Sequence, residues 1–129
     1  MNSKLILAAG IAVWAASSAV LAGTNDYTFE PVKAEVKKGS GVIVAVRLIH
    51  KPSGKAVPDA VLFSPRMDMS PDGMEAMTTP VTPSVGSEPG TYSFKTDFTA
   101  PGRWLLTISA KVQGEPETVI GRVIFKATD

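Results

Sequence analysis

The chain has no cysteine among its 129 residues. Disulfides, lipid anchoring through a cysteine, thiolate metal sites and cysteine nucleophiles are therefore excluded. Only one histidine is present, His50, and there is no HExxH spacing, so a zinc hydrolase site of the usual His-rich kind is not supported. Any soft-metal chemistry must use the thioether sulfur of methionine.

Only the N-terminus contains a long apolar run. The chain opens with MNSKLILAAGIAVWAASSAVLAG, in which Lys4 precedes an apolar stretch that ends in small residues. This order is typical of a secretory signal peptide, and we expect cleavage after Ala22. An uncleaved anchor is the alternative, because residues 5–22 approach the length of a membrane span, but their Ala and Ser content suits a permanent anchor poorly. The sequence thus predicts a signal peptide over 1–22 and an exported, periplasmic domain over 23–129.

Neither sign of charge dominates. The whole chain has 13 basic and 12 acidic residues, and loss of Lys4 with the signal peptide makes the two numbers equal. This balance gives no reason to expect a nucleic acid or an anionic membrane as the partner. No Ser-His-Asp arrangement can be assembled with confidence around one histidine, and no phosphate-binding glycine loop is present, so we predict that the protein is not an enzyme.

Turn residues interrupt the remaining chain about every ten residues, as in all-β sandwiches. The intervening stretches read as seven strands, over residues 27–36, 42–50, 60–69, 78–85, 91–98, 102–112 and 119–127. In the clearest strand, 102–112, apolar residues from Trp104 to Val112 alternate with polar ones, which indicates a half-buried antiparallel strand. We expect it to form a hairpin with the last strand. The sequence predicts one all-β domain, an immunoglobulin-like antiparallel β-sandwich of about seven strands.

Methionine is confined to one short stretch, RMDMSPDGMEAM, which we call the methionine segment (residues 66–77). Apart from Met1, it contains all the methionines of the chain: Met67, Met69, Met74 and Met77. Methionine often fills irregular gaps in a core, and this explanation stays open for Met67 and Met69, which lie on a predicted strand. It fits Met74 and Met77 less well, because they follow the polar, turn-forming residues SPDG.

A single helical turn over SPDGMEAM would bring the thioethers together. Ser70 can cap such a turn, with Pro71 at its first position. Residues three apart share one face of a helical turn, so Met74 and Met77 would point the same way. If that face closes over the end of the sandwich beside Met69, three thioethers converge.

Convergent thioethers favour one class of metal ion. Thioether sulfur is soft and neutral, so it selects Cu(I), or Ag(I) as its mimic, over zinc, magnesium and calcium. It needs no deprotonation and forms no disulfide, which suits an oxidising compartment. His50, at the end of strand 42–50, is a candidate imidazole ligand, although a lone histidine is not diagnostic and an ordinary exposed strand-end residue is the favoured interpretation. The candidate metal ligands are Met69, Met74 and Met77, with Met67 and His50 as looser additions.

A calcium loop is the hard-metal alternative. The stretch DMSPDGME offers carboxylate and hydroxyl oxygens that resemble the opening of such a loop. However, Thr79 stands where the bidentate glutamate is needed, and Pro71 interrupts the pattern. We therefore expect these carboxylates to cap the turn and keep it solvated.

Two stretches of the sequence carry a resemblance to a known family: GKAVPDAVLFSPRMDMSPDGMEAM and PGTYSFKTDFTAPGRWLLTISAKVQGE. They resemble the YtkA-like domain, which is also found in FixH-like proteins and beside heavy-metal efflux transporters. The similarity covers about residues 41–127 and includes a Met-rich segment, a PG-x-Y strand and a G-x-W strand. The resemblance implies an immunoglobulin-like sandwich and an exported, metal-linked role, chiefly with copper. Unlike FixH-like members, this chain has no membrane anchor beyond the predicted signal peptide.

Two functions follow as hypotheses. The first is a periplasmic protein that binds Cu(I), or Ag(I), through the methionine segment and passes it to a heavy-metal efflux or copper-assembly protein of the envelope. The second is an interaction module without a metal, in which the methionines form an adaptable apolar patch that docks on an envelope transporter or adaptor. The first is favoured because thioethers without cysteine are a recognisable choice for Cu(I).

Overall fold

The computed structural model describes residues 23–86 and 88–129, so the predicted signal peptide lies outside the described residues. The described elements are η2 (Gly23–Asp26), β1 (Tyr27–Pro31), β2 (Glu35–Lys37), β3 (Gly39–His50), β4 (Lys55–Ala56), β5 (Val61–Met69), η3 (Ser70–Asp72), β6 (Met74–Thr79), β7 (Val81–Ser84), β8 (Thr91–Phe98), β9 (Gly102–Lys111) and β10 (Val119–Thr128). Both η elements are short 3-10 turns. No helix among the described residues has the length and apolar composition needed to cross a bilayer.

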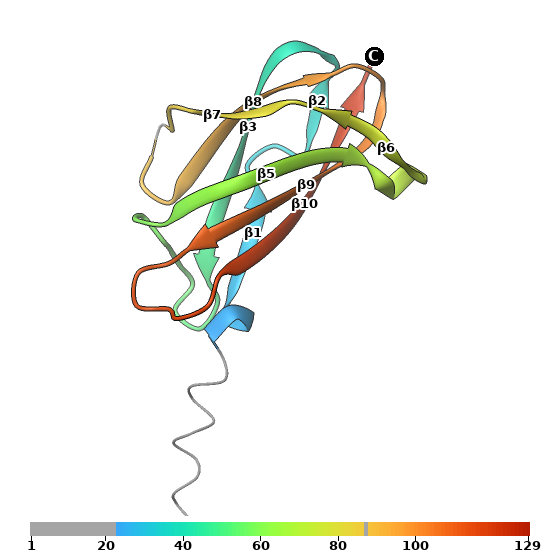
Figure 1. Cartoon of the computed structure of the whole chain (residues 1–129). Helices are drawn as coiled ribbons and strands as arrows, with labels where there is room; N and C mark the ends of the chain where they lie inside the picture. Colours follow the sequence, from blue (N-terminus) through green and yellow to red (C-terminus); the bar gives the residue numbers. More distant parts are fainter. Residues whose placement is uncertain (1–22, 87) are drawn as a thin grey trace, which may run out of the picture.

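The strands form two sheets that pack face to face (Figure 1). One has the order β1-β3-β8-β7, with β4 added beside β3, and the other has the order β2-β10-β9-β5-β6. When the seven principal strands are lettered A to G along the chain, these orders become A-B-E-D and G-F-C, which is the strand arrangement of the immunoglobulin fold. The predicted immunoglobulin-like sandwich is confirmed. The short strands β2, β4 and β6 are additions to it, and β2 pairs with β10 in parallel.

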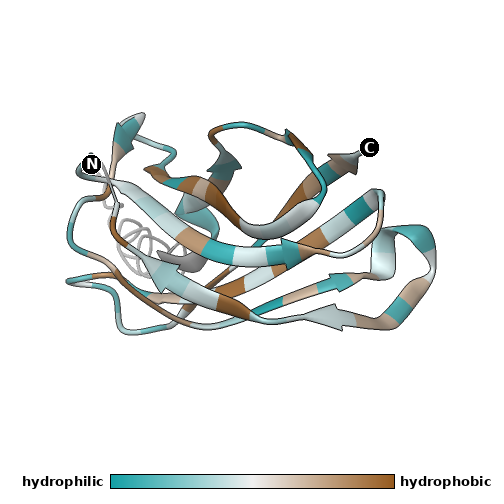
Figure 2. Ribbon diagram, turned by 90° about the horizontal axis from the view of Figure 1, so that it is seen from above, coloured by the Kyte–Doolittle hydropathy of each residue, from teal (hydrophilic) through white to brown (hydrophobic). Residues whose placement is uncertain are grey.

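Alternation along the strands produces the core. In β9, Trp104, Leu106, Ile108 and Ala110 are fully buried, as the sequence predicts. The expected hairpin with β10 is also present, in a continuous antiparallel register from Val119 opposite Ala110 to Ala127 opposite Gly102. Apolar and polar segments alternate along the strands in Figure 2. This alternation follows from the two-residue period of a β-strand.

Two sequence predictions about single elements are wrong. The stretch 27–36 is not one strand, because β1 pairs with β3 in one sheet and β2 pairs with β10 in the other. Pro31 ends β1, and the chain crosses between the sheets before β2 begins. The helical turn expected over residues 70–77 is limited to the three residues of η3, and β6 begins directly afterwards.

Strand β5 contains the irregularity that its proline indicates. Ser64 and Pro65 together lie opposite the single residue Ile108 of β9, because the register shifts between Phe63 and Arg66. This is a β-bulge, and Ser64 has a positive φ of 52°. The extra residue reverses the alternation, so Phe63 is exposed whereas Met67 is buried.

Candidate functional site

The connection between β5 and β6 is a tight turn. Its 3-10 helix begins after Met69, with proline near its first position, and ends at Gly73, whose φ is 77°. The Gly73 amide donates a hydrogen bond of 2.8 Å to the Ser70 carbonyl. The capping role predicted for Ser70 is wrong, because Met69 occupies the N-cap position and no side chain caps the turn.

Asp72 attaches this turn to the start of β9. Its carboxylate accepts a hydrogen bond of 2.8 Å from the Arg103 amide and another of 2.8 Å from Arg103 Nε. Arg103 Nη2 also donates to the Pro71 carbonyl, at 2.7 Å. The backbone and side-chain hydrogen bonds from Arg103 lower the pKa of Asp72. The methionine segment is therefore fixed to the neighbouring strand.

A buried carboxylate, that of Asp68, organises the β5 side of the turn. Asp68 Oδ1 accepts a hydrogen bond from the Ser70 amide at 2.9 Å, and Oδ2 accepts one from Arg66 Nε at 3.0 Å. Burial acts to raise the pKa of Asp68, but hydrogen bonds from Ser70 and Arg66 outweigh it, and the pKa is lowered. The carboxylates of Asp68 and Asp72 both accept hydrogen bonds from arginine side chains. They therefore serve as structural anchors of the turn.

Met67 and Met69 are core residues. Their exposed fractions are 0% and 1%, and both point between the sheets after the bulge in β5. Met67 lies opposite Leu106 of β9. Met69 approaches Gly102 so closely that a Cβ atom placed there would lie 2.6 Å from the Met69 methyl carbon. Both thioethers therefore lie in the core, which is what the core-packing interpretation of the sequence expects.

Met74 and Met77 lie at the surface. They are 45% and 40% exposed, although both side chains are apolar. Met74 opposes Met69 in the β5–β6 ladder, whereas Thr78 opposes Asp68, so Glu75, Ala76 and Met77 have no opposite residue on β5. The shared helical face expected for Met74 and Met77 is absent, because β6 is an irregular strand. The structure does bring Met74 beside Met69 at the end of the sheet.

His50 lies at the other end of the sandwich. It ends β3 as predicted, its Nδ1 is 2.8 Å from the Ser53 hydroxyl, and its ring packs against Tyr27 at 5.3 Å between centroids. Tyr27 donates a hydrogen bond to Glu115, in the turn after β9, whereas Met69 contacts Gly102 at the start of β9. Since the ten residues of β9 span about 30 Å, the structure does not bring His50 to the methionines.

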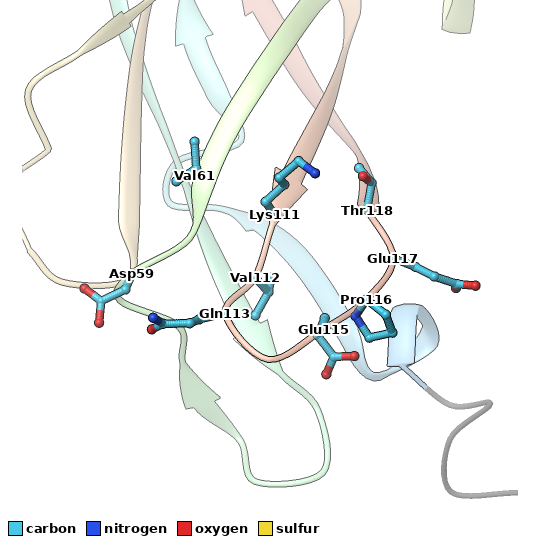
Figure 3. Close-up of a pocket in the computed structure, with 9 residues that line it drawn as sticks. All are labelled: Asp59, Val61, Lys111, Val112, Gln113, Glu115, Pro116, Glu117 and Thr118. Carbon is cyan, nitrogen blue, oxygen red and sulfur yellow. The ribbon is translucent and has the colours of Figure 1, made fainter. Parts of the chain in front are cut away.

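A hollow among the described residues also lies away from the methionine segment. It has a volume of about 560 Å³ and is open to solvent beside the β9–β10 turn (Figure 3). Its lining includes Asp59, Lys111, Glu115 and Glu117, but no thioether or imidazole. Among the residues that the structure describes, no group of three or more His, Cys, Asp and Glu side chains is arranged to hold a metal ion. The methionine segment therefore remains the candidate functional site.

Sequence reasoning missed the anchors of this site. The pairing of Arg103 with Asp72 joins residues 31 positions apart. No local pattern indicates such a pair. The one available signal was the Gly102-Arg103-Trp104 motif, since a glycine inside a strand pattern often marks a close approach of another part of the chain.

Comparison with known proteins gives a family and a set of structural neighbours. A family model described as YtkA-like matches residues 21–109. No curated protein matches the sequence significantly. Similar solved structures include the Lin-41 filamin domain, with 19% identity and a TM-score of 0.41, covering 75% of this chain and 92% of that one.

Two further solved structures resemble the chain at similar levels. The titin M3 domain has 14% identity and a TM-score of 0.36, with coverage of 77% of this chain and 91% of that one. The Escherichia coli adhesin FdeC has 16% identity and a TM-score of 0.35, with coverage of 82% of this chain and 32% of that one. The assignment of the fold given above rests on the order of the strands in the two sheets.

Proposed function

The chain belongs to the YtkA-like family, and from this premise we propose that it is an exported Cu(I)-binding protein whose accessible ligands are Met74 and Met77. The observation that carries the proposal is the exposure of these two thioethers, 45% and 40%, in a segment whose other two methionines are buried. These two sulfurs are open to solvent and therefore to a soft metal ion, whereas the sulfurs of Met67 and Met69 are not. Ag(I) is bound by the same preference for soft ligands.

The geometry of the turn supports binding by ligand exchange. Met74 and Met77 are three residues apart, so at most about 10 Å of backbone separates them. Their flexible side chains can reorient their sulfur atoms without moving the anchored backbone. If both side chains turn toward one ion, the two thioethers form a shallow site that leaves Cu(I) open to further ligands. Such a site can pass the ion to a heavy-metal efflux or copper-assembly protein of the envelope.

The remaining candidate ligands take other roles in this proposal. Met67 packs in the core, and His50 lies at the far end of the sandwich. Met69 is buried directly opposite Met74 in the ladder. It can therefore add a third sulfur only if its side chain leaves the core.

Anaerobic titration tests the proposal. Residues 23–129 contain both sheets and the core described above, so this part can be produced alone and titrated with Cu(I) against a chromophoric chelator, with Zn(II) and Ca(II) in parallel. We expect stoichiometric uptake of Cu(I) only. The double variant Met74→Leu/Met77→Leu removes both sulfurs but keeps apolar side chains of similar volume, and it should abolish uptake. Met67→Leu is the matched control and should bind normally; uptake retained by the double variant would contradict the proposal.

An interaction module is the second candidate, and the same exposed methionines favour it. Met-rich surfaces adapt to different partners. Leucine preserves such a contact, whereas serine does not. Binding to an envelope transporter or adaptor that survives Met74→Leu/Met77→Leu but is lost in Met74→Ser/Met77→Ser would support docking without a metal. Equal loss in both double variants would count against it.

A further inference from the structure

The four methionines of the methionine segment fall into two classes of accessibility. Met67 and Met69 are 0% and 1% exposed, whereas Met74 and Met77 are 45% and 40% exposed. An oxidant in solution therefore reaches two sulfurs directly and the other two only when the core opens. Core openings require free energies that approach the free energy of global unfolding.

Met69 is shielded by specific neighbours. Its methyl carbon lies against Gly102, and Asp72 Oδ2 lies equally close to the same glycine. The two hydrogen bonds of 2.8 Å from Arg103 hold the Asp72 carboxylate in place over this contact. The anchor that fixes the turn and the Met69 side chain thus meet the sheet at the same glycine.

We propose that Met74 and Met77 are the sites of selective sulfoxidation in this protein, and that their oxidation disables the soft-metal site. In the reaction, a sulfur lone pair attacks one oxygen of hydrogen peroxide. The peroxide O–O bond breaks, the attacking sulfur keeps one oxygen as a sulfoxide, and the other oxygen leaves as water. Each sulfur loses two electrons, and the peroxide is reduced.

The consequence for metal binding follows from ligand chemistry and rests on the proposed function. A sulfoxide is polar, and its sulfur keeps only one of the two lone pairs of a thioether, so it is a poorer soft ligand. Cu(I) prefers the soft thioether. The fold should not change, because both modified side chains lie at the surface. Since sulfoxides can be reduced again, the modification would be a reversible way to release the ion.

Peptide mapping tests the site of oxidation without any metal. Folded protein of residues 23–129 is treated with limiting hydrogen peroxide, and a denatured sample is treated in parallel. Trypsin leaves all four methionines in one peptide, residues 67–95, so fragment masses assign each added oxygen. We expect Met74 and Met77 to react at least about tenfold faster than Met67 and Met69 in the folded protein, because the buried pair waits for core opening. All four should react similarly when denatured.

Two outcomes would overturn the proposal at different steps. Oxidation of Met67 or Met69 at the rate of Met74 in the folded protein would remove the selectivity. Undiminished Cu(I) uptake by protein that carries both sulfoxides would remove the link to the metal site. If the reduced protein takes up no Cu(I), the proposed function fails by itself, while the mapping result still decides where the protein is oxidised.

Ag(I) provides a further readout, because hydrogen peroxide does not oxidise Ag(I), whereas it oxidises Cu(I). Saturating Ag(I) should slow the oxidation of Met74 and Met77 and leave the rates of Met67 and Met69 unchanged. The variant Met74→Leu/Met77→Leu is the matched control, and it should gain no oxygen under conditions that fully modify the two exposed residues. Equal protection of all four methionines would indicate general stabilisation of the fold and would contradict binding at the exposed pair.

Discussion

Gly102 is the residue that allows the methionine segment to pack on the sheet. It has a φ of 135°, and a Cβ atom at this position would lie 2.6 Å from both the Met69 methyl carbon and Asp72 Oδ2. Both contacts belong to the segment that carries the exposed thioethers. The packing of one glycine is thus linked to the position of the candidate site.

Gly102→Ala should destabilise the protein by about 1–3 kcal/mol, because the added methyl group overpacks the contact with Met69 and Asp72. Gly114→Ala is the matched control: Gly114 also has a positive φ, of 91°, but a Cβ atom there meets nothing within 4 Å. Urea denaturation measures both variants. Equal losses of stability in Gly102→Ala and Gly114→Ala would show that backbone strain, and not the crowded contact, is the cause.

Asp68 should make the protein sensitive to acid. Its pKa is lowered from 3.8 in the folded protein, so the unfolded state binds the proton more readily. The stabilisation is therefore complete above about pH 5 and is lost as the pH falls through 3.8 towards the lower folded pKa. Unfolding free energies measured across this range should decline less steeply for Asp68→Asn than for the parent. Asp129→Asn, with a side chain that is 83% exposed, should follow the parent curve; an unchanged slope in Asp68→Asn would contradict the prediction.

The elements differ in how well their sequences predict them. Strand β9 is predicted closely because its apolar residues recur with period two over its whole length, and the core on one side imposes that period. The methionine segment is not predicted closely, because a positive φ at Gly73 and long-range hydrogen bonds from Arg103 determine its conformation. Propensity alone allowed a helical turn there, whereas tertiary pairing with β5 made residues 74–79 a strand. Local patterns do not contain that information.

The bulge in β5 shows the same limit. A proline inside a strand is typical of a bulge or an edge position, but the effect of Pro65 on the direction of Met67 and Met69 depends on the register with β9. A regular strand would place Val61, Phe63 and both methionines on one face. The bulge instead exposes the first two and buries the methionines.

Substitutions at Ser64 should report on this bulge. Ser64 is exposed and has a φ of 52°, where a β-branched side chain is strongly disfavoured. Ser64→Val should therefore cost about 1–2 kcal/mol, whereas Ser64→Gly should be close to neutral, since glycine adopts this conformation readily. Thermal or urea unfolding distinguishes them. A valine variant as stable as the glycine variant would mean that the bulge rearranges easily.

Across the whole molecule, the two ends of the sandwich are built differently. One end holds the methionine segment, with its two arginine–carboxylate pairs. The other end holds His50, Tyr27 and the β9–β10 turn, where the Tyr27 hydroxyl donates a hydrogen bond of 2.7 Å to Glu115. This bond ties β1 of one sheet to a turn of the other.

Tyr27 should make the alkaline stability of the molecule depend on this contact. Burial, together with the hydrogen bond to Glu115 and the charges of Glu115 and Asp26, raises the pKa of Tyr27 to about 12 from 10.0. The stabilisation is therefore present below pH 10 and is lost as the pH rises towards 12. Tyr27→Phe should lower the free energy of unfolding by about 1 kcal/mol at neutral pH. Between pH 10 and 12, the free energy of unfolding of the variant should decline less than that of the parent. Denaturation at several pH values checks both effects, and parallel curves for variant and parent would contradict the assignment.

The most direct test of the Cu(I) account is to observe each methionine separately. Isotope-labelled ε-methyl groups of methionine give one NMR signal per residue, and single Met→Leu variants assign them. On titration of residues 23–129 with Ag(I), the signals of Met74 and Met77 should shift together and reach saturation at one equivalent, while Met67 stays unchanged. A shift of Met67 as large as those of Met74 and Met77, or no shift in any methionine, would contradict a soft-metal site at the exposed turn.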